Sequence, residues 1–332
     1  PCGGGWSCEE GICQPEPGAL IWARQGGGGH HAVGYATAIP PDGGAVVTGY
    51  YYDGDMVFPD GEGIASVLSK HIEHSMLFVA GYSPQGALMW ASTTEDNVVG
   101  EGITLGVDGE VLLLGRLERY RLDGEFLPAS SIIMGFDEAG EESWHEELIS
   151  QSWGANSGES IASSEDGSYV VTGQYSSTLT LASGLEEEIT LPSPGGISSQ
   201  IYIARYSSEH TLLWAMGTGN GSGVGTPRYY GSVISGDGSV LVGGGFDDMA
   251  TFAEGTPEEI TLVSEGFYDA MVARYSPDGT LLWKKSAGGP DRDGAESVAA
   301  LSDGSAVITG SFEGERSEEH TFELQSLLII SY

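Results

Sequence analysis

Short apolar runs separated by turn residues recur along the chain. The clearest example is residues 270–284, AMVARYSPDGTLLWK, in which two apolar runs flank the turn sequence Ser-Pro-Asp-Gly. Similar stretches occupy residues 76–90, 131–145 and 201–215, and in all four copies an aromatic residue precedes a tryptophan by eight positions. Short runs of Val, Ile, Tyr and Trp between such turns are typical of half-buried β-strands. Each stretch is therefore predicted to be a β-hairpin.

A second pattern interleaves with the first and consists of Asp-Gly, five residues and a further glycine. It occurs five times, beginning at Asp42, Asp108, Asp166, Asp237 and Asp303. The successive aspartates are 66, 58, 71 and 66 residues apart, and recurrence at this spacing indicates a repeat architecture. Asp-Gly between apolar runs favours a tight hairpin turn, because both residues tolerate positive φ. One period thus contains two hairpins, or four antiparallel strands.

One four-stranded sheet cannot bury both of its faces, whereas radial stacking of such sheets buries them. We therefore predict an all-β fold, a β-propeller built of four-stranded antiparallel blades, over residues 19–315. Four repeats are complete and the fifth is half present. The expected hairpins lie near residues 35–51, 76–90, 103–117, 131–145, 161–175, 201–215, 232–246, 270–284 and 298–312.

Five tryptophans mark equivalent strands of the repeats, and we expect them to pack between adjacent blades. They are Trp22, Trp90, Trp144, Trp214 and Trp283. The alternative is that they form a stacking platform for a ligand. Trp22 belongs to residues 19–25, which we interpret as the lone last strand of a blade. The second repeat departs from the others, because Leu117 replaces an aromatic residue and the connection from Leu117 to Phe136 is short.

The combined pattern, with Asp-Gly…Gly-x-Phe leading into ARYSPDGTLLW at 273–283, resembles the bacterial β-propeller repeats of the SBBP and delta-60 type. The resemblance covers residues 19–315. It implies a secreted protein or lipoprotein like those of myxobacteria, and it specifies a fold rather than an activity. Residues 316–326, RSEEHTFELQS, resemble a translated sequencing-library adapter, so we interpret residues 316–332 as a non-native tail.

The charge of the chain restricts its partners. It carries 48 acidic and 12 basic residues among 332, a formal net charge of −36. Such a charge repels phosphate backbones and anionic membrane surfaces, so we exclude nucleic acid as a partner. No run of 18 apolar residues occurs, which excludes a transmembrane helix.

Residues 1–18 form a Cys- and Gly-rich leader and linker. Cys2, Cys8 and Cys13 lie within twelve positions, and the chain has no other cysteine. We interpret them as disulfide candidates, which predicts an extracytoplasmic location. A zinc site is the alternative, although no histidine lies nearby. Because three is an odd number and the chain begins at Pro1, we expect a fragment whose signal peptide or lipid anchor lies upstream.

Side chains that could act in catalysis or metal binding are scattered along the chain and match no catalytic pattern. The histidine pairs His30–His31 and His71–His74 are interpreted as solvated. Two acidic clusters have the oxygen ligands that calcium prefers but lack the spacing of a twelve-residue calcium loop: Asp53, Asp55 and Asp60, and Asp291 and Asp293. The glycine-rich residues 217–225 contain no phosphate-binding pattern. We predict no cofactor, with calcium as the alternative.

These observations predict a non-enzymatic, secreted or surface-tethered propeller that acts as a scaffold for a protein or a glycan. Loops on one rim are the expected binding surface, including residues 53–75 and the Glu-Glu-Ile-Thr-Leu segments at 187–191 and 258–262. Two alternatives remain open. One is a quinoprotein-like (PQQ) enzyme, because DGTLLW resembles the Gly-x-x-x-Trp docking element of such propellers. The other is a calcium-dependent adhesin or lectin.

Overall fold

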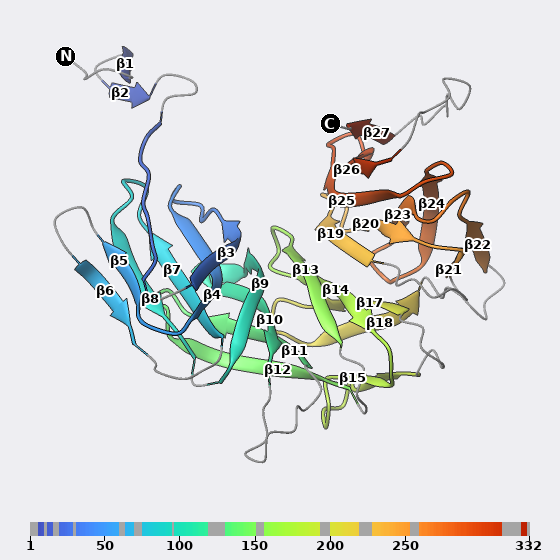
Figure 1. Ribbon diagram of the computed structural model, residues 1–332, viewed down its shortest axis with the longest axis horizontal. Coiled ribbons are helices and arrows are strands. Elements are labelled where there is room, and N and C mark those ends of the chain that lie inside the picture. The colour runs from blue at the N-terminus through green and yellow to red at the C-terminus, as the bar shows by residue number, and fades with distance from the viewer. Residues whose placement is uncertain are drawn as a thin grey trace.

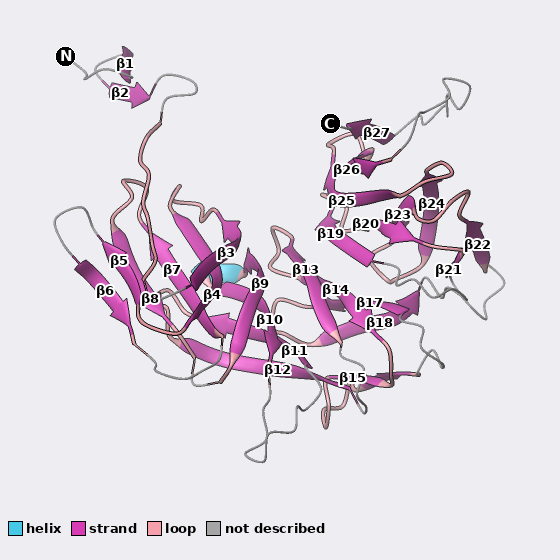
Figure 2. Cartoon of the chain, in the orientation of Figure 1, coloured by secondary structure: helices cyan, strands magenta, loops and turns pink. Residues whose placement is uncertain are grey.

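The computed structural model describes residues 6–9, 12–15, 20–28, 31–59, 64–69, 75–94, 96–118, 130–150, 156–192, 200–218, 228–252, 259–313 and 327–330. Within these residues the secondary structure is almost entirely β, as Figure 2 shows. The one helical element that they contain is the short 3-10 turn η1 (Val107–Gly109).

Four sheets each contain a unit of four strands that pair antiparallel in chain order, and the second sheet continues into a two-stranded hairpin of the following unit, which gives it six strands. The first sheet is β3 (His31–Ala38), β4 (Ala45–Tyr52), β7 (Met76–Tyr82) and β8 (Leu88–Ser92). The second is β9 (Val98–Leu105), β10 (Val111–Leu117), β11 (Ser130–Phe136) and β12 (Glu142–Ser150). The third is β13 (Ser157–Ser163), β14 (Tyr169–Tyr175), β17 (Gln200–Tyr206) and β18 (Leu212–Thr218). The fourth is β19 (Arg228–Ile234), β20 (Val240–Phe246), β23 (Asp269–Tyr275) and β24 (Leu281–Ala287).

A fifth sheet begins in the same way with β25 (Asp293–Ala300) and β26 (Ala306–Phe312). Its third strand, β27 (Leu327–Ile330), pairs parallel to β26, whereas the third strand of each other sheet is antiparallel to the second. β27 comes from residues that we excluded from the repeats. β27 thus occupies the position of a third strand but runs in the direction opposite to that of the third strands in blades with four strands.

The sheets follow one another along an open arc, with the first strand of each sheet on its inner side (Figure 1). The innermost strands β3, β9, β13, β19 and β25 contact each other in that order. Radial stacking of four-stranded antiparallel sheets around an axis is the architecture of a β-propeller, and it confirms the predicted all-β fold class. We call the five sheets blades 1 to 5.

The hydrophobic core consists of layers between successive blades. Between blades 2 and 3, for example, Leu114 and Ile133 pack with Val171 and Tyr202. Because alternate side chains of a strand point to opposite faces, a strand between two such layers is buried on both faces. The third strand β17 is buried at all seven positions for this reason. Burial on both faces explains why the central strands read as continuous apolar runs.

Short hairpins extend from the connections between the second and third strands of three blades. They are β5 (Met56–Pro59) with β6 (Ile64–Leu68), β15 (Leu179–Leu181) with β16 (Ile189–Leu191), and β21 (Met249–Phe252) with β22 (Ile260–Val263). The hairpin of blade 3 pairs with the outer strand of blade 2, because Ile149 and Ser150 of β12 face Thr180 and Leu179 of β15. This hairpin therefore links blade 3 to blade 2.

The innermost strand of every blade contains a β-bulge at the same place. The bulged residues are Tyr35, Glu101, Glu159, Tyr230 and Glu296. Each lies seven residues before the aspartate of its Asp-Gly turn. The innermost strands continue past the bulge. They therefore begin four or five residues before the hairpin boundaries expected from the sequence, for instance at His31 in blade 1.

The bulge explains the last glycine of the Asp-Gly-x5-Gly pattern. In blades 1, 3 and 5 a Cβ on Gly49, Gly173 or Gly310 would lie 1.9, 2.0 and 1.9 Å from a carbonyl oxygen of the innermost strand. A side chain at this position cannot fit without moving that backbone. The glycine is thus required by close approach of two strands and not by turn conformation.

Residues 20–26 are not assigned to a strand, although we expected one at 19–25. Gly27 forms an isolated antiparallel bridge with Val57 of β5. In the leader, β1 (Trp6–Glu9) and β2 (Ile12–Pro15) form a two-stranded sheet in which Cys8 faces Cys13 in backbone register. Cys2 lies outside the described residues, as do the side chains of Cys8 and Cys13, so the disulfide pairing stays a prediction.

Candidate functional site

The turn aspartates found in the sequence have structural partners. In blades 3, 4 and 5 the Oδ1 atoms of Asp166, Asp237 and Asp303 each accept a hydrogen bond from the backbone N–H two residues later, at 2.9 to 3.0 Å. Asp42 accepts the same bond from Gly44 at 2.8 Å. Asp108 differs, because it has a φ of 53° within η1. These side chains close the turns that join the two inner strands.

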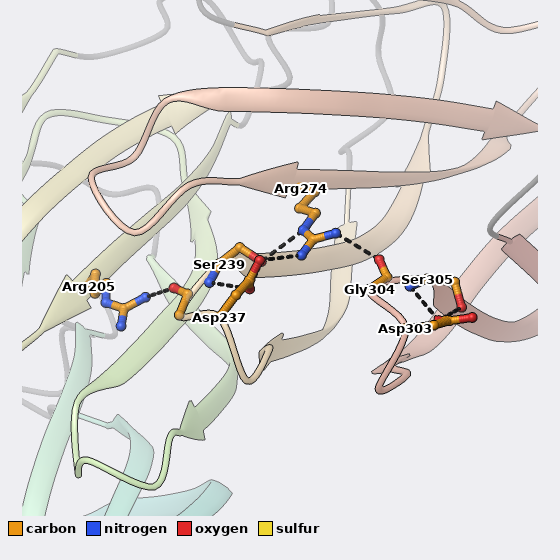
Figure 3. Close-up of polar contacts among 8 residues, drawn as sticks. Arg205, Asp237, Ser239, Arg274, Asp303, Gly304 and Ser305 are labelled. Carbon is orange, nitrogen blue, oxygen red and sulfur yellow. Dashed lines mark hydrogen bonds and ion pairs between the residues drawn. The ribbon is translucent and has the colours of Figure 1, made fainter.

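Two arginines connect successive Asp-Gly turns (Figure 3). Arg274 donates to Asp237 and Ser239 of its own blade at 2.8 Å, and to the carbonyl oxygen of Gly304 in blade 5 at 2.7 Å. Arg205 of blade 3 reaches forward in the same way and donates to the carbonyl oxygen of Gly238 at 2.5 Å. Each guanidinium thus holds the turn of the following blade in place.

The tryptophans of the repeat also contact the following blade. A Cβ on Gly86, Gly140 or Gly279 would lie 2.6, 2.3 and 3.1 Å from the indoles of Trp22, Trp90 and Trp214. All three glycines have positive φ and end the turn before the outer strand of the next blade. The indole Nε1 of Trp22 donates to the carbonyl oxygen of Pro84, and that of Trp214 to Pro277. These tryptophans lie against a turn rather than forming a platform.

The other predicted candidates do not form a site among the described residues. Asp60, His30, His71, His74 and residues 219–225 lie outside those residues. Within the described part of the chain, no group of three or more His, Cys, Asp or Glu side chains is arranged to hold a metal ion. Asp293 instead accepts a hydrogen bond from the backbone N–H of Gly289 at 2.7 Å. No helix in the described residues is long and apolar enough to cross a membrane.

The bulged residues of the innermost strands form a set that the sequence patterns did not single out. Fifteen positions after each of them, on the adjacent strand, comes the residue that directly follows the last glycine of the Asp-Gly-x5-Gly pattern. We call these the inner-edge pairs: Tyr35 with Tyr50, Glu101 with Arg116, Glu159 with Gln174, Tyr230 with Gly245, and Glu296 with Ser311. Both members of a pair lie on adjacent strands. They are at the end of the blade from which, in blades 1, 3 and 4, the short hairpins extend.

Side-chain contacts join the members of four inner-edge pairs. The rings of Tyr35 and Tyr50 stack with centroids 5.7 Å apart. Arg116 Nε donates to Glu101 at 3.0 Å, and Gln174 Nε2 donates to Glu159 at 3.2 Å. In blade 5, Ser311 Oγ donates to Glu296 at 3.4 Å. The side chain of Tyr230 lies outside the described residues.

The pairs of blades 1, 2 and 3 interact electrostatically. Burial raises the pKa of Glu101 to about 7, although Arg116 opposes the shift and the negative charges of Glu159 and Glu118 add to it. Burial also raises the pKa of Tyr35, on which Arg116 and Glu101 act from the neighbouring blade. We call the pairs of these three blades the strip, which contains aromatic, acidic and amide groups and one guanidinium, that of Arg116.

A cavity of about 420 Å³ lies at the same edge between blades 4 and 5. Its lining includes Gly245 from one inner-edge pair and Glu296 and Ser311 from another, together with Tyr268 and Arg292. The strip and the cavity offer exposed aromatic rings beside carboxylate and amide groups. Such groups bind hydroxyl-bearing or cationic ligands through stacking and hydrogen bonds.

Glu101 makes the stability of this edge dependent on pH. Its folded-state pKa lies above the ordinary value of 4.5, so the folded protein binds the proton more tightly than the unfolded chain. The free energy of unfolding therefore contains a contribution that is present below pH 4.5 and is lost as the pH rises to about 7. We expect a Glu101→Gln variant to lack this loss, and to be more stable than the wild type at pH 8 by on the order of 3 kcal/mol.

Urea denaturation at pH 4.5 to 8 measures this difference. Glu186→Gln, in an exposed turn of blade 3, is the matched control and should change the pH dependence little. A Glu101→Gln variant whose stability follows the wild type at every pH would contradict the burial of an ionisable carboxyl at this position.

No protein-family model matches the chain, and no curated protein matches it. Several solved structures are similar in part. A protein of unknown function from Bacteroides caccae is 10% identical, with 73% of this chain and 93% of that chain covered and a TM-score of 0.29. Virginiamycin B lyase from Staphylococcus aureus is 8% identical, with 76% and 83% covered and a TM-score of 0.30. The Pan2 WD40 domain of Neurospora crassa is 8% identical, with 83% and 85% covered and a TM-score of 0.29. Similarities at these levels assign the chain neither a family nor a function.

Proposed function

We propose that the protein is a non-enzymatic propeller scaffold whose inner-edge pairs bind a glycan. One observation carries this proposal. The turn aspartate and the last glycine of the Asp-Gly-x5-Gly pattern recur in all five repeats, whereas the inner-edge positions change from Tyr–Tyr to Glu–Arg, Glu–Gln, Tyr–Gly and Glu–Ser. Positions that vary in chemistry on a repeated frame are available for recognition, because the frame folds without them.

The chemistry of the strip favours a neutral glycan over an anionic one. Tyr35 is 55% exposed and offers a ring face on which a sugar can stack, and Glu159 and Gln174 can hydrogen bond to hydroxyl groups. The net charge of −36 disfavours anionic sugars. The same charge favours a basic protein segment as the second candidate ligand. The extracytoplasmic location belongs to this proposal, and a protein found in the cytoplasm would contradict it.

We expect Tyr35→Ala to weaken binding to a neutral oligosaccharide array by about tenfold, because one exposed stacking ring is lost. Surface plasmon resonance on the strongest array hit measures the change in Kd. Tyr52→Ala is the control, because Tyr52 lies on the adjacent strand β4 of the same blade, is 41% exposed and is not an inner-edge residue.

Undiminished glycan binding by Tyr35→Ala would remove the inner edge as the binding surface. Binding of basic peptides in place of glycans would select the second candidate. Conversion of a bound glycan to a product would contradict the non-enzymatic part. Pyrroloquinoline quinone and calcium should be tested by thermal shift, and a rise in Tm with either would revive the corresponding alternative.

A further inference from the structure

The junction of blades 2 and 3 is the place where the chain departs most from its own repeat. His210 ends the turn before the outer strand of blade 3, a position that is glycine in blades 1, 2 and 4. It retains the left-handed conformation with a φ of 63°. A non-glycine residue in this region is unfavourable, so an observed case calls for a local reason.

Three further departures lie beside His210. Tyr169 begins the second strand of blade 3, where the other blades have Ala or Val. Glu110 follows the Asp-Gly turn of blade 2, where the other blades have Gly or Ser. Glu146 lies two residues after Trp144 on β12, where the other blades have Ser, Met or Lys. These side chains come from four separate segments and meet at one junction.

Glu110 orients the histidine. It accepts a hydrogen bond from Trp144 Nε1 at 2.8 Å and lies 3.3 Å from His210 Nε2, while the imidazole lies 4.0 Å from the indole of Trp144 between ring centroids. Burial alone would raise the pKa of Glu110, but the hydrogen bonds from His210 and Trp144 outweigh it and lower this pKa. The carboxylate thus takes the Nε2 side of the imidazole as its hydrogen-bond partner and fixes the orientation of the ring.

Two polar atoms at the junction are buried without a hydrogen-bond partner among the described residues. They are the hydroxyl of Tyr169 and Nδ1 of His210. The Tyr169 side chain is fully buried, its ring lies 6.0 Å from that of His210, and its pKa is raised by burial and by the charges of Glu146 and Glu110. Both atoms are enclosed by the packed blades, so they lie behind the surface of the junction and not on it.

A cavity of about 550 Å³, which we call the junction cavity, is lined by His210, Trp144 and Glu146, whereas Tyr169 is not part of its lining. It lies between β12, the turn of the β15–β16 hairpin and the turn before β18. Its described lining contains four glutamates and no lysine or arginine: Glu146, Glu147, Glu187 and Glu209. Ile149 and Leu185 add apolar surface and are 40% and 58% exposed.

Glu146 is the best-held carboxylate of this lining. Its Oε1 atom accepts hydrogen bonds from the backbone N–H of Ala182 at 2.8 Å and from the Tyr206 hydroxyl at 3.1 Å. Burial and the charge of Glu187 raise its pKa, so a positive ligand would relieve an unfavourable negative charge. The Tyr206 ring also stacks on Tyr169 with centroids 5.0 Å apart, which links the carboxylate to the unpaired hydroxyl.

We propose that the junction cavity binds an organic cation, an ammonium or guanidinium group on an apolar stem. The positive group faces Glu146 and the neighbouring carboxylates of Glu187 and Glu209, and the stem lies against Ile149 and Leu185. The volume suits a small ligand or one basic side chain of a peptide. This site lies on the outer flank of blades 2 and 3 and is separate from the inner-edge pairs.

Isothermal titration of the full chain with agmatine tests the proposal, with 1-butanol as the neutral comparison. We expect saturable binding of agmatine at one site and none of butanol. Glu146→Gln should weaken agmatine binding at least tenfold. His210→Gly introduces the residue that other blades carry and removes one side of the lining, so this variant should remain folded by circular dichroism and still bind at least tenfold more weakly.

Glu296→Gln, on the inner edge, should bind agmatine like the wild type. A short peptide with one arginine distinguishes the two sources of the cation: tighter binding than agmatine assigns the site to a partner's side chain, and weaker binding assigns it to a free amine. Absence of saturable binding to the wild type, or equal binding by the wild type and the Glu146→Gln variant, would overturn the proposal.

Discussion

Gly173→Ala is expected to destabilise the protein strongly, although it adds only one methyl group. The new Cβ would lie 2.0 Å from the carbonyl oxygen of Ser157 and 2.6 Å from the Tyr202 hydroxyl. The carbonyl belongs to the bulged innermost strand and can move only if the pairing of Gly158 with Gly173 is broken. We expect a loss of roughly 3–5 kcal/mol in the free energy of unfolding, measured by urea denaturation.

Gly236→Ala is the matched control for this variant. Nothing lies within 4 Å of a Cβ built at Gly236, and its φ is not in the left-handed region. This control should therefore be nearly neutral. Equal stability of the two variants would mean that the innermost strand has no fixed bulge, and that the last glycine of the repeat pattern has another cause.

Trp214→Ala is expected to lower the free energy of unfolding by about 3 kcal/mol, because a large side chain is removed from the junction of two blades. The indole packs against Gly279 of blade 4 and donates to the carbonyl oxygen of Pro277 at 2.8 Å. In a stack of repeats the stability depends on the interfaces between neighbours as well as on each repeat. Loss of this contact should thus separate the unfolding of blade 4 from that of blade 3.

Hydrogen exchange of the strands of blades 3 and 4 measures this separation, and urea denaturation measures the total loss. Leu213→Ala is the control, because Leu213 is the neighbouring residue on β18 and is 52% exposed. A Trp214→Ala variant that unfolds in one transition at the wild-type midpoint would contradict a stabilising role for this junction.

The blade architecture was predictable because it depends on local chemistry that repeats. Asp-Gly favours hairpin turns, and the spacing from Tyr275 to Trp283 recurs wherever a second hairpin forms. These signals fix which strands are neighbours. The place of the tryptophans against the turn glycines follows from the blade docking, and the positive φ of Gly86 and Gly279 agrees with their turn positions.

The inner-edge pairs were missed because a bulge is a relation between two strands and not a local pattern. A signal was nevertheless present, since the bulged residue always lies seven positions before the turn aspartate and its partner eight positions after it. Comparison of the five repeats at those two positions would have found Glu101 and Arg116. The raised pKa of Glu101, however, depends on burial that arises only when the blades pack together.

The junction cavity could be predicted only in part. His210 stands where the other turns have glycine, and this substitution is visible in the sequence. Glu110, Glu146 and Tyr169 belong to separate segments of two blades, so their proximity depends on how the blades dock. The hydrogen bond from Ala182 to Glu146 further requires the rim hairpin of blade 3 to lie beside blade 2.

The contacts between blades have a direction, and this affects how the chain folds as it is synthesised. Trp214 and Arg205 reach from blade 3 into turns of blade 4, and Arg274 reaches from blade 4 into blade 5. The outer strand of blade 2 likewise gains its neighbour β15 from blade 3. Each blade is thus completed only when the next one emerges from the ribosome. Folding from the N-terminus would therefore leave a single unfinished blade at any time, always at the growing end.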